Sequence, residues 1–368
     1  MYFGEYRLNA PESIDTPAML TYPHLVSHNI GEIIRICGGA DRVVPHAKTH
    51  KCPEILKMQV ERGLTSFKCA TLKEAEMAAE NGATEIIMAY PLLHPRKLER
   101  LGLLKASNEG IDIKVIASTE EHLAVLTTTM RNLRQTIGVY MDLDTGMRRT
   151  GVQPGARAHA FYALIHETEF LRPVGVHVFD GEALYIPDFN VRKTIVEANI
   201  SEMEKIWEEA DKQRIPVEDN LAGGSWSFFH YINEYRIRST PGTWIYWDTR
   251  NAEMKELNFK IASLVLGQVV DRDPQKDTVT VDIGSKSCSS DQPLEHRFHL
   301  IEYPGTEIVQ QSEEHGVVKL NGENLDVGQF VFAAPGHACT MTVKYPFTNV
   351  INEQGDRIGS FNHTARDR

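Results

Sequence analysis

The sequence lacks the features that would place the protein in a membrane or in a nucleic-acid complex. No apolar run is long enough to span a bilayer, and residues 1–11 lack the apolar core of a signal peptide. No basic cluster resembles a nucleic-acid footprint, and the formal net charge is -11. We therefore expect a soluble protein that binds neither membranes nor nucleic acids.

Cysteine is scarce as well. The chain has five cysteines, an odd number, and they are widely scattered at positions 37, 52, 69, 288 and 339. A disulfide framework uses an even number of cysteines at close spacing, whereas free cysteines are typical of a reducing compartment. The cysteine content therefore predicts a cytoplasmic location.

A dinucleotide-binding glycine motif is also missing, because no G-x-G-x-x-G opens a helix after the first predicted strand. What is present is an alternation of apolar strand-like runs and helical patterns from residue 16 to residue 243. Eight such units in a row favour a parallel (β/α)8 barrel over an open doubly wound sheet. The predicted strands are 18–22, 42–44, 65–69, 85–90, 113–117, 137–143, 174–179 and 219–222, and the predicted helices include 25–37, 72–81, 95–106, 153–167 and 191–213.

The pattern changes after residue 262. Short β-like runs separated by turn residues follow, which predicts a small β-domain. The predicted strands are 264–270, 278–283, 298–302, 317–320, 329–333 and 340–345. With 368 residues, the chain is expected to form a barrel domain over residues 12–255 and a β-domain over residues 256–368 together with residues 1–11.

A lysine follows the second predicted strand. Lys48 lies in the segment PHAKTHK, with the basic residues His46, His50 and Lys51 around it. Polar groups at the carboxyl ends of barrel strands are candidates for function, and basic neighbours favour an uncharged, nucleophilic lysine. Lys48 is thus placed to form a Schiff base with an aldehyde cofactor. Taken alone, the segment is more typical of a solvated strand end.

Two more strand ends carry candidate residues. The loop DLDTGMRRTG after the sixth predicted strand contains Arg149, which can bind a phenolate or carboxylate oxygen. After the seventh predicted strand come His177, Asp180 and Glu182, which are candidates for acid–base chemistry. The alternatives are surface arginines in a structural loop and a packed histidine beside a carboxylate.

Glycine and hydroxyl groups cluster late in the barrel pattern. Gly223, Gly224 and Ser225 follow the last predicted barrel strand, and Gly242 and Thr243 come soon after it. Loops of this kind in this part of a barrel commonly bind a phosphate through backbone N–H groups. Each loop by itself is also compatible with an ordinary turn.

The β-domain contains a pair of possible metal ligands. His337 and Cys339 are two residues apart, so on a strand their side chains lie on one face and can share an ion such as zinc. Two protein ligands leave room for water or a substrate hydroxyl. The alternative is a half-buried His and Cys on a strand.

The segment QSEEHG, with Glu313, Glu314 and His315, is either a solvated hairpin tip or a loop that reaches the barrel mouth.

The order of these motifs resembles one family. The chain resembles the D-threonine aldolase and D-serine dehydratase family of fold type III pyridoxal-phosphate enzymes, which is related to alanine racemase. The segments that carry the resemblance are PHAKTHK at 45–51, DTGMRRTG at 144–151, SEEHG at 312–316 and HAC at 337–339.

The resemblance implies that Lys48 holds pyridoxal phosphate and that His337 and Cys339 hold a divalent metal, zinc or alternatively manganese. It also implies a homodimer with its sites at the subunit interface. His46, Arg149, Gly223, Gly224, Ser225, Gly242 and Thr243 become candidate cofactor ligands, and His177 and Glu182 become catalytic candidates beside Lys48.

The resemblance also implies a D-β-hydroxy amino acid substrate. Retro-aldol cleavage to glycine and an aldehyde is favoured, because the barrel segments FKCAT and EAE look more like D-threonine aldolases. The His-x-Cys pair leans toward the alternative, β-elimination as in D-serine or D-3-hydroxyaspartate dehydratases. A racemase, with Tyr303 or Tyr345 as its second acid–base residue, is a further alternative.

The chain departs from the family's pattern at Glu182, because members of the family commonly carry a Gly-His pair where this chain has Gly181-Glu182.

Overall fold

The computed structural model describes all 368 residues, which form two compact units. The barrel unit comprises Ile33–Lys48, Leu56–Gly242 and Arg368, and the β-unit comprises Met1–Glu32, Thr49–Ile55 and Thr243–Asp367. The chain therefore crosses from the barrel unit to the β-unit directly after Lys48 and returns at Leu56. None of the helices combines the length and the apolar composition needed to cross a membrane.

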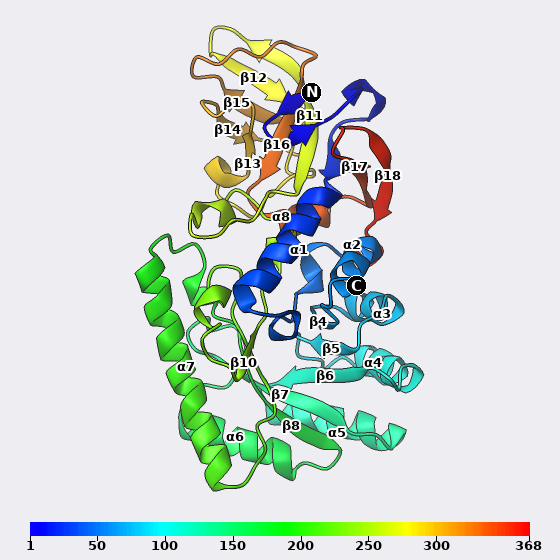
Figure 1. Cartoon of the computed structure of the whole chain (residues 1–368), viewed down its shortest axis with the longest axis vertical. Coiled ribbons are helices and arrows are strands. Elements are labelled where there is room, and N and C mark those ends of the chain that lie inside the picture. The colour runs from blue at the N-terminus through cyan, green and yellow to red at the C-terminus, as the bar shows by residue number, and fades with distance from the viewer. The chain divides into compact units, whose positions relative to one another are not determined.

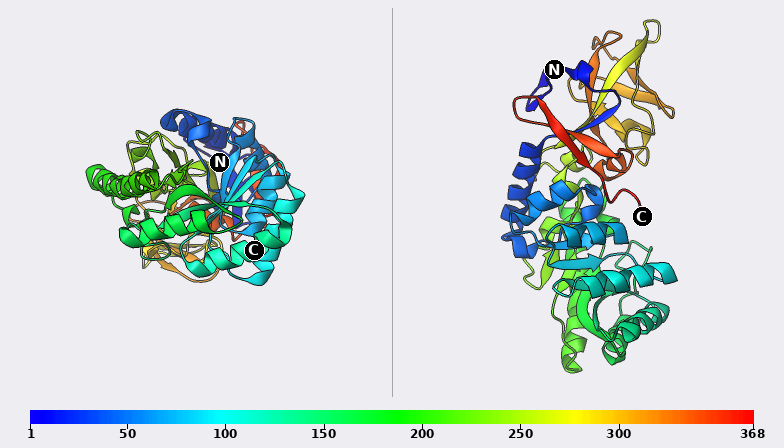
Figure 2. Two further views of the ribbon diagram at one scale, coloured as in Figure 1. Left: turned by 90° about the horizontal axis from the view of Figure 1, so that it is seen from below. Right: turned by 90° about the vertical axis from the view of Figure 1, so that its right-hand side faces the viewer.

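Seven parallel strands form the sheet of the barrel unit, in the order β10-β9-β8-β7-β6-β5-β4. Residues 43–46 close it, because Val43 forms a parallel bridge with Ser239 of β10 and His46 forms one with Lys68 of β4. The predicted (β/α)8 barrel is thereby confirmed (Figure 2). The strands are β4 (Ser66–Cys69), β5 (Glu85–Met88), β6 (Asp112–Ala117), β7 (Ile137–Leu143), β8 (Leu171–Val178), β9 (Asn220–Ala222) and β10 (Ile237–Ser239).

With one exception, the helices follow barrel strands and lie around the outside of the sheet (Figure 1). The exception is the helix Pro23–Cys37, which precedes the first barrel segment. The N-terminal ends of three of them are capped by Thr71, Thr119 and Asp188, whose side-chain oxygens accept backbone N–H groups of the first turn. The five predicted helices are confirmed. The helices are α1 (Pro23–Cys37), α2 (Pro53–Val60), α3 (Leu72–Glu80), α4 (Pro95–Ser107), α5 (Glu120–Leu133), α6 (Ala156–Glu167) and α7 (Phe189–Lys212).

Buried apolar side chains fill the interior of the barrel. One buried cluster takes a single residue from each of six strand segments: Val44, Ile87, Ile116, Tyr140, Val174 and Leu221. Such a layer is what the inward-facing positions of a small parallel barrel provide. It separates the carboxyl ends of the strands from their amino ends.

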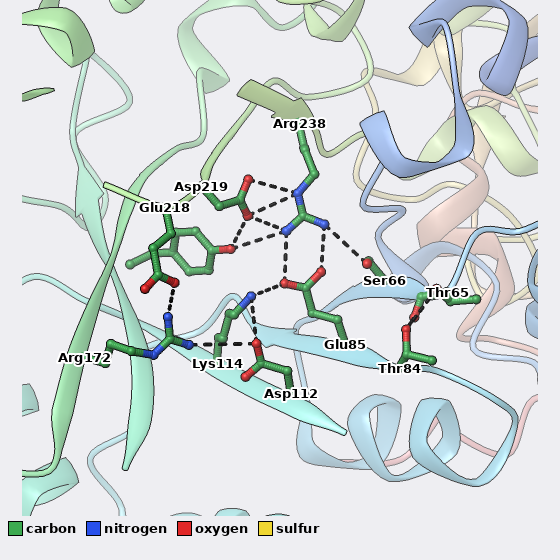
Figure 3. Close-up of polar contacts among 11 residues, drawn as sticks. Thr65, Ser66, Thr84, Glu85, Asp112, Lys114, Arg172, Glu218, Asp219 and Arg238 are labelled. Carbon is green, nitrogen blue, oxygen red and sulfur yellow. Dashed lines mark hydrogen bonds and ion pairs between the residues drawn. The ribbon is translucent and has the colours of Figure 1, made fainter. Parts of the chain in front are cut away.

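The amino ends of the barrel strands are tied together by an ionic network (Figure 3). Arg238 of β10 bonds Glu85 of β5 over 2.7 Å and also pairs with Asp219. Lys114 of β6 pairs with Glu85 and lies 3.1 Å from Asp112. The contact between Arg238 and Glu85 joins β10 to β5, which are not neighbours in the sheet, so it ties the amino end of the barrel together.

The β-unit contains a nine-stranded sheet, which confirms the predicted β-domain. Its path runs β14-β15-β12-β11-β3-β17-β18, and β16 joins β13 to β11. A short hairpin of β1 (Tyr2–Phe3) and β2 (Tyr6–Arg7) precedes it. The sheet strands are β3 (Ala18–Thr21), β11 (Ser263–Asp273), β12 (Thr278–Val281), β13 (Phe298–Leu300), β14 (Glu307–Gln311), β15 (Gly316–Lys319), β16 (Phe330–Pro335), β17 (Phe347–Ile351) and β18 (Arg357–Asn362).

The prediction that residues 18–22 form the first barrel strand is wrong. Strand β3 pairs antiparallel with β11 and parallel with β17, inside the β-unit. All four of its residues are buried, and a strand buried on both faces shows the same apolar run in either kind of sheet. The eighth barrel strand is β10, which is hard to recognise in the sequence because it is short and contains Arg238. Lys48 therefore follows the first barrel strand, not the second.

The predicted strand at 340–345 is also wrong. A short helix, α8 (Ala338–Thr342), covers the first half of this segment, with His337 as its N-cap residue. The threonines that favoured a strand are accommodated in the helix, since Thr342 donates its hydroxyl to the carbonyl of Ala338 over 3.0 Å. The consequence for the metal pair is described below.

Candidate active site

Lys48 lies in a 3-10 turn, η3 (Ala47–Thr49), just past the carboxyl end of the closing barrel segment. His46 holds this turn, because its backbone N–H donates to Pro241 and its Nδ1 accepts the backbone N–H of Lys48 over 3.4 Å. The next two basic residues bond within the β-unit: His50 Nδ1 lies 3.1 Å from the carbonyl oxygen of Cys52, and Lys51 Nζ donates to Ala365.

Three cations face one aromatic ring at the carboxyl end of the barrel. The ring centroid of Phe179 lies 5.8 Å from Lys48 Nζ, 6.0 Å from Lys68 Nζ and 4.9 Å from the guanidinium carbon of Arg149. A ring face attracts cations, and three of them concentrate positive charge at this end of the barrel. Such a concentration fits the binding of an anionic group.

Lys68 is the residue of this cluster that sequence reasoning missed as a site residue. Its side chain is buried, and its Nζ donates to Thr240 Oγ1 over 3.1 Å. Burial lowers the pKa of Lys68 to about 7, and the charges of Lys48 and Arg149 act in the same direction. Thr240 in turn donates to the carbonyl of Gly223 over 3.0 Å, which connects Lys68 to the predicted phosphate loop.

His177 and Asp142 form a buried pair on neighbouring strands. The two residues are in register between β7 and β8, and His177 Nδ1 lies 2.7 Å from Asp142 Oδ1. Burial and the charge of Lys68 lower the pKa of His177, although Asp142 opposes this, so the imidazole is neutral at pH 7. Its Nε2 is buried and has no hydrogen-bond partner. An orphaned ring nitrogen of this kind fits a site that a bound group completes.

The loop after β7 is shaped by Asp144. Its Oδ1 accepts the backbone N–H groups of Gly146 over 3.1 Å and Arg148 over 2.9 Å, and its Oδ2 accepts Gln153 over 2.6 Å. These bonds fold the loop tightly enough that Arg148 adopts a positive φ of 55°. The next residue, Arg149, is thereby directed to the Phe179 ring.

Glu182 lies in the turn η4 (Gly181–Ala183) that follows β8. Its Oε1 accepts the hydroxyl of Thr145 over 2.8 Å and the amide of Asn199 over 3.3 Å. Its Oε2 is shielded from solvent and has no partner. One oxygen of the carboxylate therefore accepts two hydrogen bonds, and the other accepts none.

The glycine loop after β9 is held by a second carboxylate. Gly223 has a φ of +87°, and a Cβ there would lie 2.8 Å from the Cα of Phe228, so only glycine fits. The Gly224 N–H donates to Asp180 Oδ1 over 3.0 Å, which fixes the loop. Burial raises the pKa of Asp180, and the charge of Glu182 raises it further. Ser225 is buried in the same loop.

The metal pair of the β-unit is not on a strand. His337 caps α8 and Cys339 lies in its first turn, yet the two side chains still interact. His337 Nδ1 lies 2.6 Å from Asp291 Oδ2, a partner the sequence did not reveal. A ligating histidine commonly donates its second ring nitrogen to a carboxylate, so this contact suits a metal ligand. Cys339 Sγ lies 3.1 Å from Thr49 Oγ1 and 3.7 Å from Thr243 Oγ1.

Other acidic and basic groups do not add to this pair. The structure contains no group of three or more His, Cys, Asp or Glu side chains arranged to hold a metal ion. Glu313 and Glu314 lie at the tip of the hairpin between β14 and β15, where both pair with Lys286. His315 closes that tip through its carbonyl, which accepts the N–H of Ser312 over 2.8 Å.

The fold and these residues define a class: a (β/α)8 barrel with a lysine, Lys48, at its carboxyl end and a β-unit that follows it. Residues 24–249 match the family described as alanine racemase, N-terminal domain, and residues 262–351 match the "Putative serine dehydratase domain". The chain belongs to the alanine racemase N-terminal domain family, and the expected kinship is thereby confirmed.

Several curated proteins are similar to this chain. The 3-hydroxy-D-aspartate aldolase of Paracoccus denitrificans (strain Pd 1222) is 22% identical over 337 residues, 88% of this chain and 85% of that protein. The D-threonine aldolase of an Arthrobacter species is 24% identical and covers 80% and 77% of the two chains. The D-serine dehydratase of Dictyostelium discoideum is 23% identical and covers 95% and 96%.

Solved structures share the fold over nearly the whole chain. The D-threonine aldolase from Filomicrobium marinum superposes with a TM-score of 0.88 at 23% identity and covers 98% of this chain and 97% of its own. The D-threo-3-hydroxyaspartate dehydratase from Delftia sp. HT23 has a TM-score of 0.82 at 20% identity and covers 96% and 98%.

Proposed function

We propose that this protein is a pyridoxal-phosphate-dependent lyase that cleaves D-β-hydroxy amino acids to glycine and an aldehyde, as D-threonine aldolase does. The observation that carries this proposal is the placement of Lys48 on the ring of Phe179 together with Lys68 and Arg149. A lysine among cations is a suitable nucleophile toward an aldehyde, and the surrounding charge suits an anionic cofactor.

The cofactor, when bound, supplies an electron sink for the charge that develops on the substrate. Lys48 would hold it covalently, and Arg149 and His46 would contact its polar groups. Gly223, Gly224, Ser225, Gly242 and Thr243 would form the phosphate loops. The N–H of Gly224 already donates to Asp180, so Gly224 would help to hold the loop in place rather than donate to the phosphate.

The proton of the substrate hydroxyl needs an acceptor. Glu182 Oε2 has this role in our proposal, because it is the open oxygen of a carboxylate that is otherwise held in place. The neutral His177, whose Nε2 is also open, is the second candidate. Both lie at the carboxyl end of β8, where barrel enzymes carry their catalytic groups.

His337 and Cys339 would hold a divalent metal, zinc or alternatively manganese. Imidazole and thiolate suit zinc, and the contact of His337 with Asp291 fixes the tautomer that leaves Nε2 for an ion. Such an ion acts as a Lewis acid on a substrate oxygen. We further propose a cytoplasmic homodimer with its sites at the subunit interface.

The second candidate is β-elimination to an oxo acid and ammonia, as in D-serine dehydratase. The thiolate of Cys339 in the His-x-Cys pair favours it. The racemase alternative has less support, because the hydroxyl of Tyr345 donates to the carbonyl of Ser287 over 2.8 Å and that of Tyr303 contacts Gln329. Neither hydroxyl is poised as a second acid–base group.

Product identification tests the proposal. The purified protein, loaded with pyridoxal phosphate and zinc or manganese, is mixed with D-threonine and D-serine in turn, with Lys48→Ala as the inactive control. Glycine and acetaldehyde from D-threonine would support the aldolase. Ammonia and pyruvate from D-serine, without glycine, would move the protein to the dehydratase branch. Equilibration of D- and L-isomers would overturn both.

A further inference from the structure

Glu182 is a carboxylate without a counter-charge. The two groups that donate to its Oε1, the Thr145 hydroxyl and the Asn199 amide, are both uncharged, and its Oε2 has no partner although solvent does not reach it. A shielded carboxylate oxygen keeps much of its field, because little water screens it. Any anionic group that approached Oε2 would therefore be repelled.

The Glu182 side chain is held in place from three sides. A Cβ on Gly146 would lie 3.2 Å from its Cδ, so the loop backbone packs directly against it. Asn199, from α7, donates to both Glu182 Oε1 and the hydroxyl oxygen of Tyr231, the latter over 3.2 Å. The Tyr231 hydroxyl donates a hydrogen bond to Asp180 Oδ2 over 3.1 Å. Because Asn199, Tyr231 and Asp180 are buried, their contacts restrain the Glu182 carboxylate.

The carboxyl end of the barrel is thus divided by charge. Lys48, Lys68 and Arg149 gather around Phe179, whereas Asp180 and Glu182 lie in the turn that directly follows it. The charge of Glu182 raises the pKa of Asp180, which shows that the two carboxylates act on each other. An amino acid can place its own carboxylate among the cations, but a second carboxylate would meet Glu182.

We propose that Glu182 restricts the substrate to D-β-hydroxy amino acids whose β-substituent carries no negative charge, and that Thr145 and Asn199 are the positioning residues that hold it. This inference rests on the proposed lyase function. It separates the threonine and serine type of substrate, with a methyl group or hydrogen on the β-carbon, from 3-hydroxyaspartate, which carries a carboxylate there. Like charges brought close together are a strong means of rejecting the wrong ligand.

The test measures binding, so it does not depend on turnover. D-Alanine and D-aspartate have no β-hydroxyl, and they differ in charge at the β-carbon. Their dissociation constants are measured for the cofactor-loaded protein from the change in cofactor absorbance. We expect D-aspartate to bind the wild type at least tenfold more weakly than D-alanine. In Glu182→Gln this ratio should fall about tenfold.

Two further variants complete the test. Thr145→Val keeps the shape of the side chain but removes the 2.8 Å hydrogen bond, so the ratio should fall severalfold with the carboxylate still present. Glu120→Gln removes the same charge from an exposed position on α5 and should leave the ratio unchanged.

A ratio in Glu182→Gln within twofold of the wild-type value would overturn the inference, as would an equal shift in Glu120→Gln. Failure of the underlying lyase proposal looks different. In that case the wild type would show no cofactor absorbance that borohydride bleaches, or that absorbance would respond to neither amino acid.

Discussion

Arg238 Nη1 lies 2.7 Å from Glu85 Oε2 and so joins the last barrel strand to β5 across the amino end of the barrel. The same guanidinium pairs with Asp219, and Tyr140 donates to that aspartate over 2.5 Å. Figure 3 shows the guanidinium of Arg238 between the carboxylates of Glu85 and Asp219. The end of the barrel opposite the candidate site is therefore a place of stability rather than of chemistry.

The first prediction concerns acid stability. Burial alone would raise the pKa of Glu85, but Arg238 and Lys114 outweigh it and lower the pKa to about 2. A carboxyl with a lowered pKa in the folded state stabilises above its unfolded pKa of about 4.5, and this contribution is lost as the pH falls toward 2. Glu85→Gln should therefore cost up to about 3 kcal/mol of unfolding free energy at pH 7.

Urea unfolding of the wild type and the variant between pH 7 and pH 3 measures this effect. The difference between the two proteins should shrink as the pH falls below about 4.5. Glu109→Gln, at an exposed position, is the control and should follow the wild type. A constant difference across the range would show that packing, not charge, accounts for the loss.

The second prediction compares two buried lysines. Lys68 has a pKa of about 7 in the folded protein, so between pH 7 and 10.5 the unfolded chain binds more protons and stability rises with pH. At pH 7 the buried amine destabilises the folded protein, and Lys68→Met should stabilise the cofactor-free protein by up to about 4 kcal/mol. Lys114→Met should destabilise it by a similar amount, since Glu85 and Asp112 lose their partner.

Unfolding free energies of the wild type, Lys68→Met and Lys114→Met, measured at pH 7 and pH 10, test this prediction. The advantage of Lys68→Met should diminish at pH 10, because the free-energy cost of deprotonating Lys68 on folding decreases as the pH approaches the unfolded pKa of about 10.5. Equal destabilisation by both substitutions would mean that Lys68 is charged and paired in the folded protein.

Sequence reasoning located Lys48 because a lysine after a short apolar run and the glycine loops later in the chain are both local patterns. It could not locate Lys68 or Phe179. Lys68 is one residue of an ordinary buried strand, and its importance arises only when barrel closure brings β4 beside residues 43–46. Phe179 is recognisable only through the three cations that face it.

The β-unit shows the same limit. His337 and Cys339 were identified from their spacing, but the spacing was assigned to a strand, and a helix turn brings the two side chains together instead. Asp291 lies 46 positions from its partner His337 in the sequence, and nothing local marks it. Likewise, β3 looks like any buried strand until β11 and β17 provide its partners.

The third prediction tests the covalent site. Lys48→Ala should abolish the borohydride-bleachable absorbance of the cofactor-loaded protein and all turnover. Lys57→Ala, at an exposed position on α2, should change neither. Mass spectrometry of the reduced, digested wild type should find the cofactor on the peptide that contains Lys48. Finding it on Lys68 instead would reassign the reactive lysine within the same cluster.

The last prediction concerns the metal. Cys339→Ala removes a ligand, so the protein should keep its covalently bound cofactor but lose metal and turnover. Asp291→Asn leaves both ligands and removes only the carboxylate 2.6 Å from His337 Nδ1. Loss of such a partner typically weakens metal affinity about 10- to 100-fold.

Competition with a chromophoric chelator measures that affinity, and added zinc should restore turnover to Asp291→Asn but not to Cys339→Ala. If Cys339→Ala retained full activity after chelator treatment, the Lewis-acid role of the pair would be wrong, and the proton acceptor at Glu182 would have to act on the hydroxyl alone.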